Sequence, residues 1–348
     1  MPDTKGFVGL DSRRGLTLDP RLGMVLAGGL YLLWAYFLFA PHAHELSHFK
    51  FLYAVNSAIA AFGTFLLSRR WLAGWTPAVL SGLFYGFGPF GLSFLGFHPV
   101  AGLTFAAVPW LLLPAVYWQH GRQPTLFRFG IRAILCALPF VFIVGFFWVF
   151  SQHWVGPLFL LPSKTALTVY DFKGLLLPLS MTGRPVVLGL YHVGLLAALM
   201  GLFVYLTSQR IVVLIPPVAG LVLAFLDPLF LVSPVIWAAL PMVFLAILAG
   251  LGVQALLWAG KTDAKWVLAC LLVGLLLGGA CLALYLLQNA SVYKNPALFY
   301  LAASACIGVL FLLIRQGYRW LPLRGALLVT LAATDCFLSA RWLIDKLL

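Results

Sequence analysis

The residues best equipped for chemistry lie in a short polar stretch between two long apolar runs, PHAHELSHFK at residues 41–50. The stretch holds Glu45, the single glutamate of the chain, between His44 and His48 in the pattern H-E-x-x-H. Residues four apart on a helix share a face, so both imidazoles can reach one metal ion with the carboxylate beside them. The spacing therefore predicts an acid–base or metal site, and the structural alternative is a histidine-rich interfacial loop without metal.

Two kinds of catalytic site fit this stretch. In a transferase, Glu45 is the general base that deprotonates an acceptor hydroxyl, and His44 or His48 binds a divalent ion or the donor phosphate. In a zinc protease, the two histidines bind zinc, Glu45 activates the bound water, and Asp227 is the expected third ligand. Intramembrane zinc proteases carry a similar motif within a span, whereas here it follows the outer end of the first apolar run.

A second set of polar residues follows in the longest connection of the chain, residues 151–186. Asp171, Lys173 and Arg184 are expected to form a polar cluster, in which the two cations can hold a phosphate or pyrophosphate. The alternative is an interfacial anchor for lipid headgroups. His98, at the edge of another apolar run, is expected to face the same substrate.

One further carboxylate lies deep in the last apolar run. Asp335 indicates a functional site, because an ionisable side chain inside a membrane costs free energy. Arg341, six residues on, and other polar neighbours are candidates to satisfy it.

The composition is that of a membrane protein. Of 348 residues, 63% are hydrophobic and 9% charged, whereas a soluble domain carries about 25% charged residues. The net charge of +13 comes from basic residues scattered in short loops. Membrane lipids are therefore the expected partners, and no nucleic-acid partner is expected.

The apolar runs predict an all-α transmembrane bundle of about eleven spans, in a single membrane domain over residues 1–348. Residues 1–21 are expected to be a cytoplasmic tail, and residues 151–186 an amphipathic loop on the outer face. The glycines around Pro89 are predicted to end a helix or form a re-entrant turn. The expected spans are 22–40, 52–68, 76–94, 99–117, 130–150, 187–207, 211–226, 235–258, 266–287, 297–314 and 325–343.

The distribution of lysine and arginine favours a cytoplasmic N-terminus. With that orientation the inner loops hold about twice as many basic residues as the outer loops, as the positive-inside rule requires. The H-E-x-x-H stretch, the turn at 87–98, the 151–186 connection and Asp227 then all fall on the outer face.

Residues 56–118 resemble the early core of bacterial polytopic glycosyltransferases of the GT-C fold. The similar features are an apolar span ending in paired arginines, a small-residue span, a Gly-Pro-aromatic turn, His98, and a Pro-Trp-Leu helix. Two later segments also resemble that family, VYDFKGLLLPLSMTGRPVVLGLYHVGLLAALMGLFVYL and PMVFLAILAGLGVQALL.

The resemblance implies a transferase in the bacterial inner membrane that takes a sugar from a polyprenyl-phosphate-type donor on the outer face. The family's acidic residue after the first span corresponds to Glu45. The first loop has one glutamate where the family often has paired acidic residues, and no large outer domain follows the spans. A non-catalytic subunit that keeps this fold as a scaffold among other membrane subunits is therefore the alternative function.

Overall fold

The structure is a computed structural model that describes residues 19–44, 51–118, 126–153, 166–181, 184, 186–207, 211–229, 232–316 and 320–348. These residues form α-helices and short 3-10 helices and contain no strand. The prediction of an all-α protein is therefore confirmed. One hydrophobic core runs through the packed helices.

The long helices follow the predicted apolar runs closely. They are α2 (Pro20–Phe39), α3 (Leu52–Ser68), α4 (Trp75–Gly86), α6 (Pro99–Tyr117), α7 (Leu126–His153), α9 (His192–Thr207), α10 (Ile215–Phe225), α11 (Ala239–Trp258), α12 (Ala264–Gln288), α13 (Lys294–Gln316) and α14 (Leu321–Leu347). Short helices connect them: η1 (Ala40–His42), α5 (Pro89–Ser93), η3 (Phe94–Gly96), η4 (Val169–Phe172), α8 (Lys173–Leu176), η5 (Pro178–Ser180), η6 (Ile211–Leu214), η7 (Pro234–Ala238), η8 (Lys261–Asp263) and η9 (Ser291–Tyr293).

Within the described residues, eight helical segments are long and apolar enough to cross a membrane, which supports an integral membrane protein. The other three expected spans fall on α3, α9 and α10, which have 17, 16 and 11 residues. A straight crossing needs about 20 apolar residues, so helix length alone does not establish eleven spans. The eight segments are Pro20–His42, Trp75–Gly96, Pro99–Tyr117, Gly130–Phe150, Pro234–Trp258, Lys261–Gln288, Ser291–Gln316 and Leu321–Leu347.

Two interruptions explain why some helices are short. The helix α4 ends at Gly86 and α5 begins at Pro89, so the predicted helix end at the glycine-proline turn is confirmed. The second interruption is the non-helical segment 187–191, which is buried directly before α9. A hydrogen bond of 2.8 Å from the backbone N of Val187 to Oγ of Ser93 joins this segment to the end of α5. Protein buries both interruptions, which is the setting in which non-helical backbone is tolerated inside a membrane.

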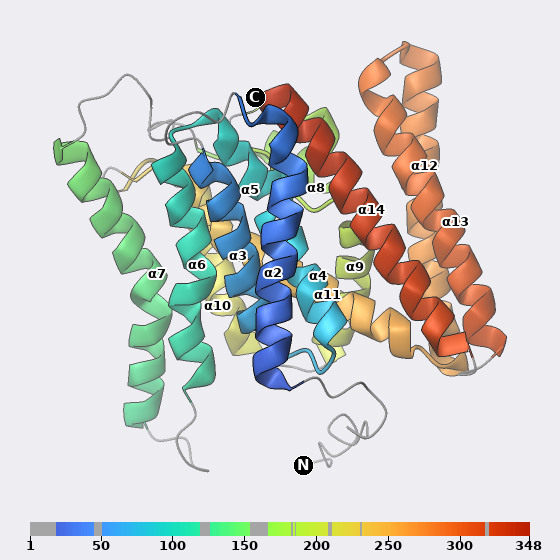
Figure 1. The fold of residues 1–348 in the computed structure, drawn as a ribbon, viewed down its shortest axis with the longest axis horizontal. Helices are drawn as coiled ribbons and strands as arrows, with labels where there is room; N and C mark the ends of the chain where they lie inside the picture. The colour runs from blue at the N-terminus through green and yellow to red at the C-terminus, as the bar shows by residue number, and fades with distance from the viewer. Residues whose placement is uncertain are drawn as a thin grey trace.

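The bundle has two flanks and a centre. Figure 1 shows α7 on one flank and the α12–α13 hairpin on the other, with α2, α3 and α4 between them. The last helix, α14, contacts α13, α11, α9, α4 and α2 and so joins the hairpin to the centre. The ends of α2 and α14 lie together at one end of the bundle (Figure 1), where His42 and Asp345 are hydrogen-bonded.

The described part of the 151–186 connection packs into that same end. It forms η4, α8 and η5, as short helices were expected, but Leu167, Asp171, Gly174 and residues 177–179 are buried. Part of the connection is therefore packed into the protein. It closes the end of the bundle and leads into the buried segment before α9.

Candidate functional site

The H-E-x-x-H stretch is only partly within the described residues. His44 lies in a turn after η1, while Glu45 and His48 lie outside the described residues. Asp227, the expected third zinc ligand, is exposed after α10. In the described part of the chain, no three histidine, cysteine, aspartate or glutamate side chains gather as metal ligands would.

The neighbouring His42 joins two helices. Its Nε2 lies 2.8 Å from Oδ1 of Asp345, and Nε of Arg341 lies 3.0 Å from the same oxygen. Arg341 also donates to the carbonyl of Leu38 at 3.1 Å. These contacts tie the end of α2 to the end of α14, and they engage Arg341 with Asp345 rather than with Asp335.

The three residues predicted to share a polar cluster do lie together. Asp171 is buried, and its Oδ2 accepts from the backbone N and Oγ1 of Thr168 at 2.7 and 2.8 Å. Its Oδ1 lies 3.4 Å from Nε of Arg184. Asp171 therefore shapes the turn that begins η4 and holds Arg184 in place.

Two cations flank one aromatic ring in this cluster. Nζ of Lys173 lies 5.6 Å, and Cζ of Arg184 5.0 Å, from the centre of the Tyr170 ring. Lys173 donates a 3.0 Å hydrogen bond to the hydroxyl of Tyr293. That bond is the main reason that the pKa of Lys173 is raised, so its ammonium group stays charged. We call Tyr170, Asp171, Lys173, Arg184 and Tyr293 the outer cluster, after the connection that the sequence predicts on the outer face.

Close backbone packing fixes the helix that carries Lys173. A Cβ on Gly174 would lie 2.5 Å from the carbonyl oxygen of Leu188, so only glycine permits this approach. A Cβ on Gly189, whose φ is 133°, would overlap the carbonyl oxygen of Gly174. On another side, the hydroxyl of Tyr300 donates to the carbonyl of Leu176. The short helix α8 is therefore held between the buried segment and α13.

His98 caps the N-terminus of α6. Its Nδ1 accepts from the backbone N of Val100 at 3.2 Å, which makes His98 the N-cap of that helix. Burial lowers the pKa of His98, which favours the neutral form that this bond requires. The preceding turn is held by a 2.6 Å hydrogen bond from the hydroxyl of Tyr53 to the carbonyl of Phe97.

The structure also pairs two residues that the sequence did not pair. Nδ1 of His192 lies 2.9 Å from Oδ1 of Asp335, and both side chains are buried. Asp335 had pointed to function by its depth in an apolar run, and Arg341 was a candidate partner. The partner is His192, which lies 143 positions earlier in the chain, and local spacing carries no signal of that contact.

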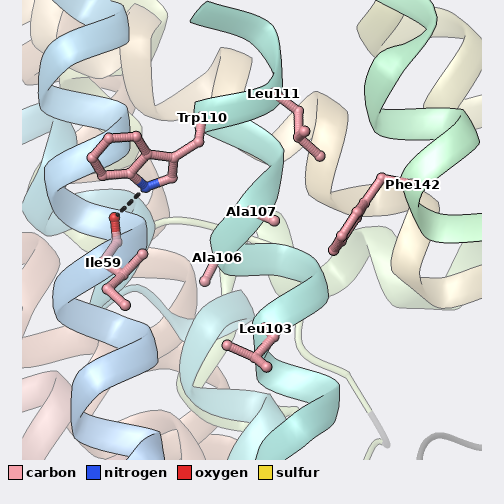
Figure 2. A pocket seen from close by; sticks show the side chains of 7 residues that line it. All are labelled: Ile59, Leu103, Ala106, Ala107, Trp110, Leu111 and Phe142. Carbon is pink, nitrogen blue, oxygen red and sulfur yellow. Dashed lines mark hydrogen bonds between the residues drawn. The ribbon is translucent and has the colours of Figure 1, made fainter. Parts of the chain in front are cut away.

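An apolar groove lies away from these polar groups, midway along α3, α6 and α7. Its volume is about 320 Å³. Figure 2 shows the indole N–H of Trp110, which donates to the carbonyl of Ile59 at 3.0 Å. None of the predicted site residues lines it. The lining residues are Ile59, Leu103, Ala106, Ala107, Trp110, Leu111 and Phe142.

Among the described residues, the outer cluster is the site where two of the predicted substrate-binding cations lie together, and the buried His192–Asp335 pair is a separate polar contact between helices. Searches of protein-family models, curated proteins and solved structures found no match to this chain.

Proposed function

We propose that this integral membrane protein binds a lipid-linked phosphate donor through its outer cluster and transfers a glycosyl group from it. The proposal rests on one observation: Lys173 and Arg184 both lie against the ring of Tyr170. A phosphate between the two cations would receive charge-assisted hydrogen bonds from both. The aromatic faces and the surrounding bilayer suit a donor whose phosphate lies at the membrane interface.

The transfer step assigns Glu45 the role of base. The acceptor hydroxyl gives its proton to the Glu45 carboxylate, and its oxygen bonds to the anomeric carbon of the sugar. The bond from that carbon to the phosphate oxygen breaks, and the electron pair leaves with the phosphate. Lys173 and Arg184 stabilise the charge that develops on this leaving group. A divalent ion at His44 and His48 is the cofactor that this proposal would include.

The proposal also includes the finer topology. The helices α3, α9 and α10 would complete eleven crossings together with the residues that flank them. The N-terminus would then lie in the cytoplasm of a bacterium, and the outer cluster on the outer face of its inner membrane. The charge distribution of the loops supports this orientation.

One observation favours the alternative of a non-catalytic subunit. Asp335 and Asp345 are each engaged in a contact between helices, and Asp171 is engaged with Thr168 and Arg184 within its own connection. Carboxylates used in this way are poor candidates for proton transfer. Such a subunit would present the same fold to other membrane chains as a scaffold.

Binding is tested with polyprenyl phosphate and the purified protein in detergent. We expect Lys173→Gln and Arg184→Gln each to weaken binding about tenfold, because each removes one charge-assisted contact. Lys265→Gln is the matched control, since Nζ of Lys265 also lies over an aromatic ring, 5.5 Å from the centre of Trp266. Equal binding by all three variants and the wild type would show that the cluster is structural.

Transfer is tested separately with a panel of polyprenyl-phosphate sugars. We expect Glu45→Gln to bind the donor as the wild type does and to lose release of polyprenyl phosphate. If the wild type binds the donor but releases no polyprenyl phosphate, and other membrane proteins copurify with it, the result would favour the scaffold function.

A further inference from the structure

We propose that Asp335, inside the membrane-spanning bundle, is a positioning residue for the outer cluster. It acts through His192 and Tyr300 on α8, and so sets the position of Lys173. The consequence for donor binding rests on the proposed function. The position of Lys173 is a separate property that can be measured without a donor.

The first link joins α14 to the start of α9. Oδ1 of Asp335 lies 2.9 Å from Nδ1 of His192, and Oδ2 accepts from the backbone N of Val193 at 2.7 Å. Ser339 donates to Oδ1 at 3.3 Å. Both carboxylate oxygens are therefore occupied, as burial in an apolar bundle requires. The carboxylate fixes the position of the imidazole and of the first turn of α9.

The second link joins His192 to α13. The imidazole is stacked on Phe299 at a centroid distance of 5.0 Å, and it meets Tyr300 edge to face at 4.7 Å. All three rings are at least partly buried. Because packed aromatic rings have few alternative positions, an imidazole fixed by Asp335 restricts the ring of Tyr300.

The third link joins Tyr300 to the helix that carries Lys173. The hydroxyl of Tyr300 donates to the carbonyl of Leu176, the last residue of α8. At the first residue of α8, Lys173 donates to Tyr293, which lies in η9 directly before α13. The two bonds clamp both ends of α8 to neighbouring residues of one segment. Loss of the Tyr300–Leu176 hydrogen bond should therefore weaken the Lys173–Tyr293 hydrogen bond.

The test measures how fast Lys173 reacts with a water-soluble amine acylating reagent, read by mass spectrometry of the purified full chain. The bond to Tyr293 raises the pKa of Lys173 and so lowers the fraction of reactive free amine. We expect Tyr300→Phe to speed acylation of Lys173 several-fold while Lys294, which is exposed at the start of α13, reacts as before. The tyrosine hydroxyl that this variant removes donates to Leu176, whereas Lys173 is bonded to Tyr293.

The matched control is Tyr85→Phe. It also removes a buried tyrosine hydroxyl bonded to a backbone carbonyl, that of Phe105 at 2.9 Å, but at the α4–α6 contact. We expect it to leave Lys173 acylation at the wild-type rate. His192→Phe keeps a ring between Phe299 and Tyr300 without the bond to Asp335, and it should raise the rate as Tyr300→Phe does. If Tyr300→Phe is not recovered folded, His192→Phe carries the test.

A wild-type rate of Lys173 acylation in the folded Tyr300→Phe or His192→Phe protein would overturn the proposal, and so would an equal increase in Tyr85→Phe. Polyprenyl phosphate binding is measured on the same samples. If the wild type does not bind it while acylation changes as expected, the proposed function fails and the positioning role stands.

Discussion

Single ionisable side chains in this bundle join helices that are distant in the sequence. Asp335 holds the start of α9, and Asp345 holds the end of α2. At the opposite end of α14, the buried Arg324 donates to the carbonyls of Ala259 and Leu313 at 3.1 and 2.8 Å. These carbonyls lie at the C-terminal ends of α11 and α13, where the helix dipole favours a cation. The buried Asp335 and Arg324 are thus placed where backbone groups or a partner side chain form hydrogen bonds with them.

His98 should make stability depend on pH. Burial lowers its pKa from the ordinary value of about 6.5. The contribution of His98 to the free energy of unfolding is therefore complete above its unfolded-state pKa. It is lost as the pH falls through the lower folded-state pKa, because protonation of Nδ1 breaks the bond to Val100. We expect the thermal midpoint of the wild type to fall on acidification more than that of His98→Asn, which keeps an N-cap acceptor without a titrating ring. Parallel pH curves for the two proteins would contradict this role.

Helix pairs in the centre approach each other through glycine. A Cβ on Gly201 of α9 would overlap the carbonyl oxygen of Leu248 in α11, and a Cβ on Gly252 of α11 would overlap that of Ala197 in α9. Small residues allow such close packing between membrane helices, where lipid removes the usual hydrophobic driving force between helices. The α9–α11 pair is therefore tightly packed, and it supports the buried segment 187–191, which ends at Tyr191 directly before α9.

Gly201→Ala should separate these two helices. We expect a loss of about 1–3 kcal/mol in the free energy of unfolding, because the added methyl group meets backbone that cannot turn aside. Gly279→Ala in α12 is the control, since nothing lies within 4 Å of the added Cβ and alanine favours helix. Unfolding in a graded denaturing detergent measures both. Equal stability of the two variants would show that the α9–α11 contact relaxes.

The molecule as a whole has two unlike ends. One end carries α8 with the outer cluster and the ends of α2 and α14 that meet in the His42–Asp345 contact, while the connection from α11 to α12, with η8 (Lys261–Asp263), lies at the other (Figure 1). A membrane around the bundle would therefore expose Lys173 and Lys261 on opposite sides.

Labelling of intact cells tests this arrangement. With a membrane-impermeant amine reagent, we expect Lys173 to react from outside and Lys261 to react only after the membrane is permeabilised. Lys261 is exposed and so reports access directly. The reverse pattern would place the N-terminus outside, and reaction of both lysines in sealed cells would contradict a bundle that spans the membrane between them.

Much of the fold was already readable in the amino-acid sequence, because hydropathy and helix breakers act locally. Low charge and long apolar runs predicted a helical membrane protein, and eleven predicted runs coincide with helices. Gly86 and Pro89 predicted a helix end that the structure contains. The short spacing between Asp171, Lys173 and Arg184 predicted their cluster, because residues of one connection stay close whatever the rest of the chain does.

Other features depended on tertiary packing. Asp335 pairs with His192, and Tyr300 bonds to the end of α8, across long separations in the chain. The burial of the segment before α9 likewise depends on helices from other parts of the chain. Arg341 was nearer to Asp335 in sequence, but it lies beside Asp345 one helical turn further on. Which charges meet inside a membrane bundle is decided by how whole helices cross and rotate. A local pattern shows that a buried carboxylate needs a partner, and the packed structure selects which partner it is.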